Sequence, residues 1–257
     1  MTARTFDAVG VRSVLIENLG RGSVNVEPGP RQDMVEGTVS GDDELLQQAR
    51  IRHDGDTLRI WFPDQVFRQH TAHIRIGVPA GTALTARTGS ADVTATVPLG
   101  RSRLTTGSGD ISLSEAVDLD LTSGSGGVSV GVLAGTAARV TSGSGDIVIN
   151  EARCAVIAKS GSGDLLVRCL AAADLRASSG SGDISLPSTS GSVDLRTASG
   201  SLTVGIADGL PAWLDLSSTS GAVRVAMDAC SAPAAGEPYV SIRGRTASGE
   251  IAVYRAS

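Results

Sequence analysis

Aromatic side chains are scarce in this chain: Phe, Trp and Tyr together make up 3% of its 257 residues. Proteins that bind single-stranded nucleic acid stack bases on aromatic rings, and they attract the phosphate backbone with an excess of positive charge. Here the formal net charge is −5. The composition therefore argues against nucleic acid as a partner.

Long apolar runs are also missing. No stretch reaches the 18 apolar residues that would indicate a membrane-spanning helix, so no membrane insertion is expected. The N-terminal segment from Met1 to Asp7 lacks the charged-then-apolar pattern of a secretory signal. These absences predict a cytoplasmic protein if the start is authentic, and an extracellular one becomes possible if a signal was removed.

Cysteine and histidine occur three times each. Cys154, Cys169 and Cys230 form no CxxC motif, so we expect small apolar side chains, with a disulfide or a metal site as the alternatives. The histidines are expected at the surface, and the close pair in His70-Thr-Ala-His73 would face opposite sides of a strand. A Ser-His-Asp triad stays open because Ser and Asp are plentiful, but the G-x-S-x-G motif in a strand-turn-helix context is missing.

What the chain has in abundance is glycine, with 32 residues placed at regular intervals. One pattern recurs nine times: a small residue with Ser directly before it, Ser or Thr three before it, and an apolar pair two and four after it. We call the small residues anchors; they are Ala91, Gly109, Gly126, Gly145, Gly163, Gly182, Gly200, Gly221 and Gly249. A short fixed period of this kind is typical of stacked repeat architectures.

Each repeat alternates apolar and other residues as a strand does, and the alternation slips by one residue at the anchor. A slip at a residue without a side chain indicates a corner. The sequence therefore predicts an all-β fold, a single-stranded parallel β-helix (β-solenoid) with about 18 residues per rung. We expect three short faces per rung, and the general crossover rule favours a right-handed coil.

The repeats do not cover the whole chain evenly. Residues 1–80 predict an irregular N-terminal β cap or wide rungs, with a hairpin turn at Asp54-Gly55 and a helix or loop over residues 41–48. Residues 81–257 predict regular solenoid repeats with a loop insertion at 228–238. We expect the two parts to form one continuous domain.

Two kinds of polar ladder follow from the repeats. The Ser and Ser/Thr positions before each anchor are expected to face inward, donating to hydroxyls or corner carbonyls of neighbouring rungs. Acids follow six anchors, and we expect them to bond corner N–H groups, with a Ca²⁺ ladder as the less favoured alternative; they are Asp92, Asp110, Asp146, Asp164, Asp183 and Glu250. No catalytic residue, no other metal site and no cofactor is predicted.

The S-G-S-G-D-I-x-L units, together with the N-terminal segment that ends in Ile74-Arg-Ile-Gly-Val-Pro79-Ala-Gly81, resemble a bacterial family of unknown function described as candidate adhesins. The resemblance covers nearly the whole chain. It implies a single-chain parallel β-helix, and it supplies no catalytic residues. The adhesin description rests on analogy, and a fold does not by itself define a function.

Three functions are compatible with these observations. The first is a non-enzymatic binding or scaffold module, adhesin-like, for an unknown protein or envelope partner. The second is a self-assembling structural protein whose solenoids stack end to end as a homo-oligomer, because an exposed terminal rung is a template for pairing. The third, less favoured, is a carbohydrate-active β-helix enzyme.

Overall fold

The computed structural model describes residues 2–63, 71–171, 173–228 and 238–256, and these residues are almost entirely β-structure. The chain divides into two compact units, Met1–Val130 and Gly131–Ser257, each of which is described by itself. His70, Cys230 and most of the expected loop at 228–238 lie outside the described residues. The expected division at residues 80 and 81 stays a prediction.

Unit 1 combines twelve strands with one short helix in its described part. They are β1 (Thr2–Val9), β2 (Ser13–Leu19), β3 (Arg21–Pro28), β4 (Met34–Gly41), α1 (Asp43–Gln48), β5 (Arg50–Asp54), β6 (Thr57–Trp61), β7 (Thr71–Val78), β8 (Ala83–Thr88), β9 (Asp92–Ala95), β10 (Ser102–Thr106), β11 (Ile111–Ala116) and β12 (Leu119–Ser123). β13 (Val128–Leu133) contains the boundary between the units.

Unit 2 has strands only in its described part. They are β14 (Ala137–Ser142), β15 (Ile147–Ala152), β16 (Ala155–Ser160), β17 (Leu165–Leu170), β18 (Leu175–Ser179), β19 (Ile184–Thr189), β20 (Val193–Thr197), β21 (Leu202–Ile206), β22 (Ala212–Ser218), β23 (Val223–Ala226), β24 (Val240–Thr246) and β25 (Ile251–Arg255).

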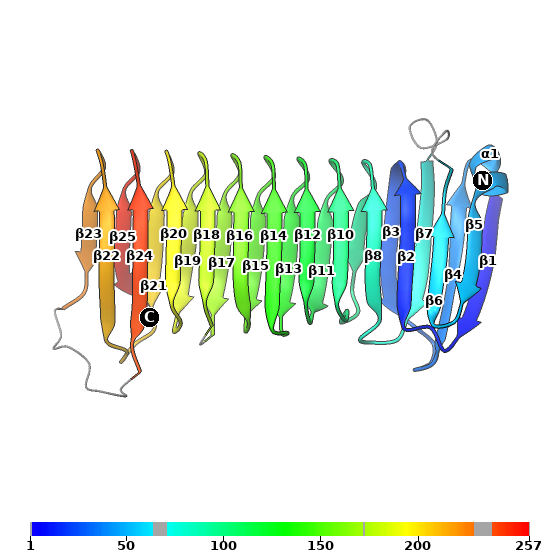
Figure 1. Cartoon of the computed structure of the whole chain (residues 1–257), viewed down its shortest axis with the longest axis horizontal. Helices are drawn as coiled ribbons and strands as arrows, with labels where there is room; N and C mark the ends of the chain where they lie inside the picture. The colour runs from blue at the N-terminus through cyan, green and yellow to red at the C-terminus, as the bar shows by residue number, and fades with distance from the viewer. Residues whose placement is uncertain (1, 64–70, 172, 229–237, 257) are drawn as a thin grey trace. The chain divides into compact units, whose positions relative to one another are not determined.

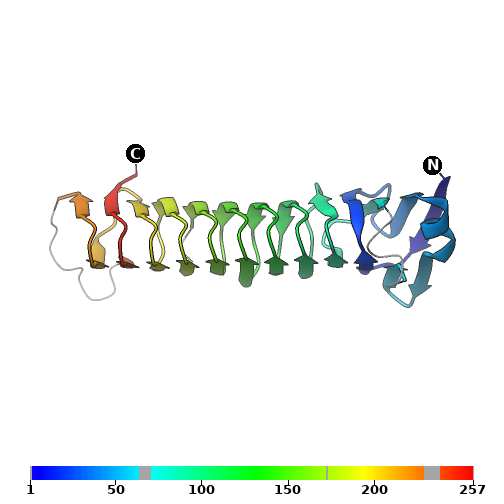
Figure 2. The ribbon, with the colours of Figure 1, turned by 90° about the horizontal axis from the view of Figure 1, so that it is seen from above.

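In unit 2 the strands alternate along the chain between two sheets of parallel strands; in unit 1 they alternate in this way from β7 onward, whereas β3 and β4 belong to one sheet and β5 and β6 to the other (Figures 1 and 2). In unit 2 one sheet has the order β14-β16-β18-β20-β24-β22 and the other has β15-β17-β19-β21-β25-β23. A rung is therefore one strand of each sheet joined by a corner at the anchor. The β-solenoid prediction is confirmed, but the expected three faces are wrong: a rung has two strands, because only one corner per rung carries the anchor pattern.

The order of the strands in space differs from their order in the chain at both ends. In unit 2, β24 and β25 lie between the rung of β20 and β21 and the rung of β22 and β23. The outermost rung is therefore β22–β23, and not the last rung of the chain, β24–β25. In unit 1, the rung of β2 and β3 similarly lies between β6–β7 and β8–β9.

Antiparallel strands close the N-terminal side of unit 1. β1 pairs with β4 and β4 with β7, while β5 pairs antiparallel with β6 across the turn at Gly55. The hairpin predicted at Asp54-Gly55 is confirmed, and Gly55 has the positive φ of 62° that such a turn favours. The segment 41–48 contains the helix α1.

The core consists of inward apolar side chains and one hydroxyl per rung at the position three before the anchor. Thr197 illustrates the pattern: its Oγ1 donates to Gly182 O at 3.1 Å and accepts from Gly200 N–H at 3.1 Å. The buried polar group is thus satisfied within two rungs. The Ser directly before the anchor is exposed instead, as Ser108 and Ser199 show, so the inward prediction was wrong for this position.

The slip in alternation explains the difference. Thr106, Gly109 and Ile111 are all buried, so the chain turns between Thr106 and Gly109 and directs Ser108 outward.

None of the described helices is long and apolar enough to cross a membrane.

Candidate functional site

The acids that follow the anchors lie at exposed corners and bond the backbone of the next rung. In unit 1, Asp92 Oδ1 accepts from Asp110 N–H at 2.9 Å, and Asp110 Oδ1 accepts from Gly127 N–H at 2.8 Å. These contacts are the corner hydrogen bonding that the sequence favoured.

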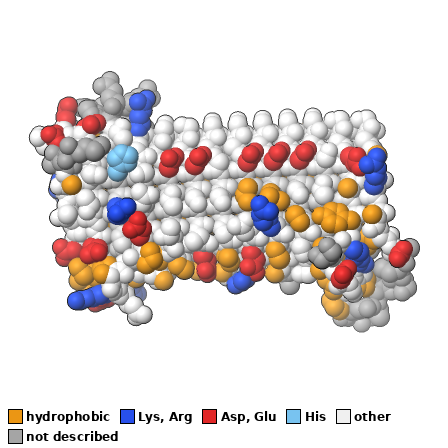
Figure 3. Space-filling view, turned by 180° about the vertical axis from the view of Figure 1, so that it is seen from behind, with side chains coloured by type: hydrophobic (Ala, Val, Ile, Leu, Met, Phe, Trp, Pro, Cys, Tyr) orange, Lys and Arg blue, Asp and Glu red, His pale blue; other side chains and the backbone are white. Residues whose placement is uncertain are grey.

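Unit 2 repeats the arrangement. Asp146 Oδ1 accepts from Asp164 N–H at 2.9 Å, Asp164 Oδ1 from Asp183 N–H at 2.8 Å, and Asp183 Oδ1 from Ser201 N–H at 2.7 Å. Figure 3 shows acidic side chains in line within the units. Glu250 differs, because it pairs with Arg224 Nη1 at 2.6 Å.

Metal ligands do not gather in the described part of the chain: no group of three or more His, Cys, Asp or Glu side chains is placed to hold an ion there. Each of the five aspartates already has Oδ1 engaged by a backbone donor. The Ca²⁺ ladder stays a prediction. Cys154 is buried and Cys169 is half-buried.

A serine and a histidine meet on the outward face of the β3–β7 pair. Ser23 Oγ lies 2.9 Å from His73 Nδ1, inside a hollow of about 430 Å³. The described residues that line this hollow include no carboxylate, so the pair lacks the third group that orients a catalytic histidine. Its neighbours in the hollow belong to the paired strands β3, β4 and β7.

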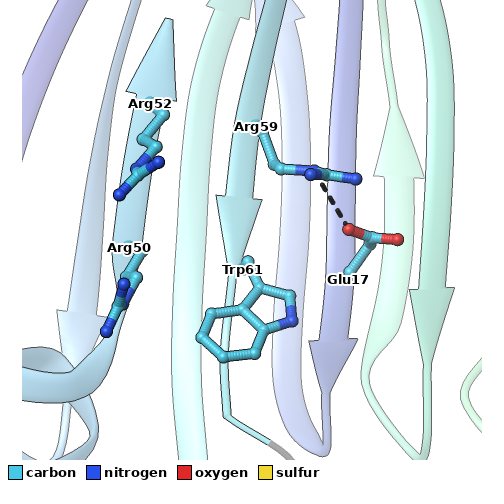
Figure 4. A pocket seen from close by; sticks show the side chains of 5 residues that line it. All are labelled: Glu17, Arg50, Arg52, Arg59 and Trp61. Carbon is cyan, nitrogen blue, oxygen red and sulfur yellow. Dashed lines mark ion pairs between the residues drawn. The ribbon is translucent and has the colours of Figure 1, made fainter.

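A different hollow, of about 290 Å³, lies on the outward face of the other sheet of unit 1 (Figure 4). Its lining comes from three neighbouring strands: Glu17 from β2, Arg59 and Trp61 from β6, and Arg50 and Arg52 from the edge strand β5. We call these five residues the arginine–tryptophan pocket. No sequence argument singled them out.

The turn at Gly55 sets the register of this pocket. Because Asp54 pairs with Thr57, Arg52 stands opposite Arg59 and Arg50 stands opposite Trp61. The parallel pairing of β2 with β6 then brings Glu17 beside Trp61. All five side chains share one face because they are spaced by two along their strands.

Two contacts organise the side chains. Arg59 Nε lies 3.2 Å from Glu17 Oε2, and the Arg50 guanidinium carbon lies 5.9 Å from the centroid of the Trp61 ring, within cation–π range. Three arginines with one glutamate give the lining an excess of two positive charges in a protein whose net charge is −5. A hollow in unit 2 on the same sheet is balanced, with Asp174 and Asp194 beside Arg176 and Arg243.

Part of this pocket was within reach of sequence reasoning. Recognising the hairpin puts Arg50, Arg52, Arg59 and Trp61 on one of its faces, but counting outward from an Asp54-Gly55 turn would pair Arg52 with Thr57. In the structure Asp54 itself pairs with Thr57, which places Arg52 opposite Arg59. Glu17 was not within reach, because the pairing of β2 with β6 joins segments about forty residues apart and bypasses the chain order.

Two stacked parallel sheets, glycine corners and internal hydroxyls define a β-solenoid built from repeated two-strand rungs. The chain belongs to the family described as Toastrack DUF4097, whose model matches residues 18–253. The family assignment agrees with the resemblance inferred from the S-G-S-G-D-I-x-L units. No match was found among curated proteins.

Solved structures of similar proteins come from several bacteria. A candidate adhesin from Bacteroides fragilis is 15% identical, with a TM-score of 0.47, 98% of this chain and 97% of that chain being covered. A candidate lipid-binding protein from Parabacteroides distasonis is 13% identical, with a TM-score of 0.47 and coverage of 98% and 96%. A candidate cell adhesion protein from Clostridium sporogenes is 11% identical, with a TM-score of 0.23 and coverage of 99% and 100%.

Proposed function

We propose that this protein is a non-enzymatic, adhesin-like binding module that attaches to an anionic component of the bacterial envelope through the arginine–tryptophan pocket. The observation that carries the proposal is the excess positive charge of this pocket on a protein that is acidic overall. A positive patch of this kind attracts and orients an anionic partner, and arginine and tryptophan are the residue types that dominate binding energy at protein surfaces.

The rest of the described surface supports binding without catalysis. Many of the exposed arginines are already paired with acids, as in Arg101–Asp118, Arg103–Asp120 and Arg153–Glu151. The Arg153 guanidinium also lowers the pKa of Glu151, which keeps that carboxylate charged and paired. The Ser23–His73 contact lacks the further groups of a hydrolase. Among the hollows of the described residues, these features favour the arginine–tryptophan pocket, whose lining has three arginines and one glutamate, as the binding site.

The test is co-sedimentation of the purified chain with a bacterial envelope preparation. We expect saturable binding that falls at least about tenfold when Arg50, Arg52 and Arg59 are all changed to Ala, since charged contacts contribute more than 1 kcal/mol each. The matched control changes Arg101 and Arg103 to Ala, because both are paired with acids; Arg103 lies in β10 of the same sheet and Arg101 directly precedes that strand. Equal binding by both variants would contradict the proposal.

End-to-end self-assembly is the second candidate, and the outermost rung of unit 2 favours it. β22 and β23 are the last strands of their sheets, so each leaves one row of backbone N–H and C=O groups unpaired by the described strands. Val223 and Val225 occupy the register of the buried Ile251 and Val253, yet they are 44% and 45% exposed. The inward face of this rung therefore has no cover within the described part of unit 2.

A further inference from the structure

The arginine–tryptophan pocket contains a like-charge pair that the fold alone does not require. Arg52 and Arg59 stand directly opposite each other on antiparallel strands. Like charges in that position destabilise a strand pair, because their side chains start only about 5 Å apart. A residue pair that destabilises its strands, with no compensating contact elsewhere, indicates a functional site.

Neighbouring groups relieve the repulsion only in part. Glu17 pairs with Arg59, whose side chain is still 56% exposed, and Arg50 lies over the Trp61 ring. Figure 4 shows the Arg59 guanidinium directed toward Glu17 and away from Arg52, and the hollow lies over the strands that carry these side chains. The indole and the stacked Arg50 form the adjoining wall (Figure 4).

We propose that this pocket binds a phosphoryl group, either on a small soluble phosphomonoester or on a lipid headgroup; the inference rests on the proposed envelope-binding function and names what that site recognises. A phosphomonoester carries about −1.5 to −2 charges at neutral pH, which matches the excess of two positive charges in the lining. Arginine forks bind phosphate oxygens in a bidentate manner, so Arg52 can hold one group, and Arg59 can join it by turning from Glu17 toward Arg52.

The pocket size fits the same class of ligand. A hollow of about 290 Å³ is small for a drug-sized ligand and suits a phosphoryl group with a few attached atoms. A single carboxylate would neutralise only half of the excess charge. The remainder of the ligand would extend along Trp61 or into solvent, since the hollow opens on the face of the sheet.

The fluorescence of Trp61 reports the binding, provided that the second tryptophan is removed by Trp213→Phe. In that background we titrate inorganic phosphate and glycerol 3-phosphate at low salt. In a separate arm we measure co-sedimentation with phosphatidylcholine vesicles that contain phosphatidic acid, against vesicles of phosphatidylcholine alone. Saturable binding in the soluble arm identifies a free phosphomonoester as the source, and binding confined to the phosphatidic acid vesicles identifies a headgroup.

The decisive double variant is Arg52→Gln with Arg59→Gln. Its control is Arg101→Gln with Arg103→Gln, which removes the same number of positive charges at and directly before β10. We expect the first variant to bind at least about tenfold more weakly and the second to bind as the parent does. Failure of both arms, or equal loss in both variants, overturns the phosphoryl inference. If envelope binding still depends on Arg50, Arg52 and Arg59 in that case, the proposed function holds and the ligand is an anion other than a phosphoryl group.

Discussion

At the scale of single residues, the anchor glycines are required by space and not by backbone conformation. None of the anchors has a positive φ, but a Cβ built on Gly182 would collide with the carbonyl oxygen of Gly163 in the neighbouring rung. The corners stack so closely that only a hydrogen atom fits between them. The first anchor, Ala91, is the one unit in which a side chain is accommodated at this position.

The matched pair Gly182→Ala and Gly127→Ala tests this explanation. Gly182→Ala should lower the free energy of unfolding by about 3 kcal/mol, because overpacking against backbone cannot be relieved by a rotamer change. A Cβ on Gly127 would meet only Asp110 Oδ1, at 3.6 Å, so Gly127→Ala should leave stability unchanged or raise it by less than about 1 kcal/mol. Denaturant unfolding of the variants measures both, and equal losses would contradict the stacking argument.

At the scale of elements, the β5–β6 hairpin combines a favourable turn with an unfavourable charge pair. Arg52→Thr removes the repulsion from Arg59 and places a β-branched residue in a strand. It should raise the free energy of unfolding by about 0.5 kcal/mol while weakening phosphoryl binding.

Arg103→Thr is the control for the hairpin variant, because Arg103 is paired with Asp120 and its loss should bring no stabilisation. Thermal unfolding at low and high salt measures the difference between the two variants. The gain from Arg52→Thr should shrink at high salt, since screening weakens the repulsion that it relieves. A gain that persists at 1 M salt would show that charge repulsion is not its cause.

At the scale of the whole molecule, the uncovered rung of unit 2 predicts concentration-dependent association. Pairing of the β22 and β23 edges with a second copy would cover Val223 and Val225, and burying apolar surface contributes about 25 cal/mol per Å². Val223→Lys with Val225→Lys should therefore hold the protein as a monomer at concentrations where the parent associates. Sedimentation equilibrium measures this difference.

Val117→Lys is the control for the association test, since Val117 is 43% exposed and belongs to neither β22 nor β23. This variant should associate as the parent does. A parent that stays monomeric across the whole concentration range would refute self-assembly through this rung.

Local sequence patterns were sufficient to predict the rung. The anchors, the hydroxyl three before each and the apolar pair after each are local patterns, and identical neighbours in stacked repeats present the same environment nine times. The family resemblance and the hairpin at Asp54-Gly55 were likewise legible, since both rest on short segments. By contrast, the prediction that Ser108 and its equivalents face inward was wrong. It extended the alternation of the strand up to the anchor, whereas the chain already turns before the anchor.

The order of the rungs at the ends, and the side chains that meet there, depend on strand pairings between segments far apart in the chain. Nothing local distinguishes β24 as the strand that lies between β20 and β22, or β2 as the strand that lies between β6 and β8. Parallel strands with similar apolar faces can pair in many orders, and the free energies of the whole stack select among them. The arginine–tryptophan pocket depends on that selection, because Glu17 reaches Arg59 only after β2 has paired with β6.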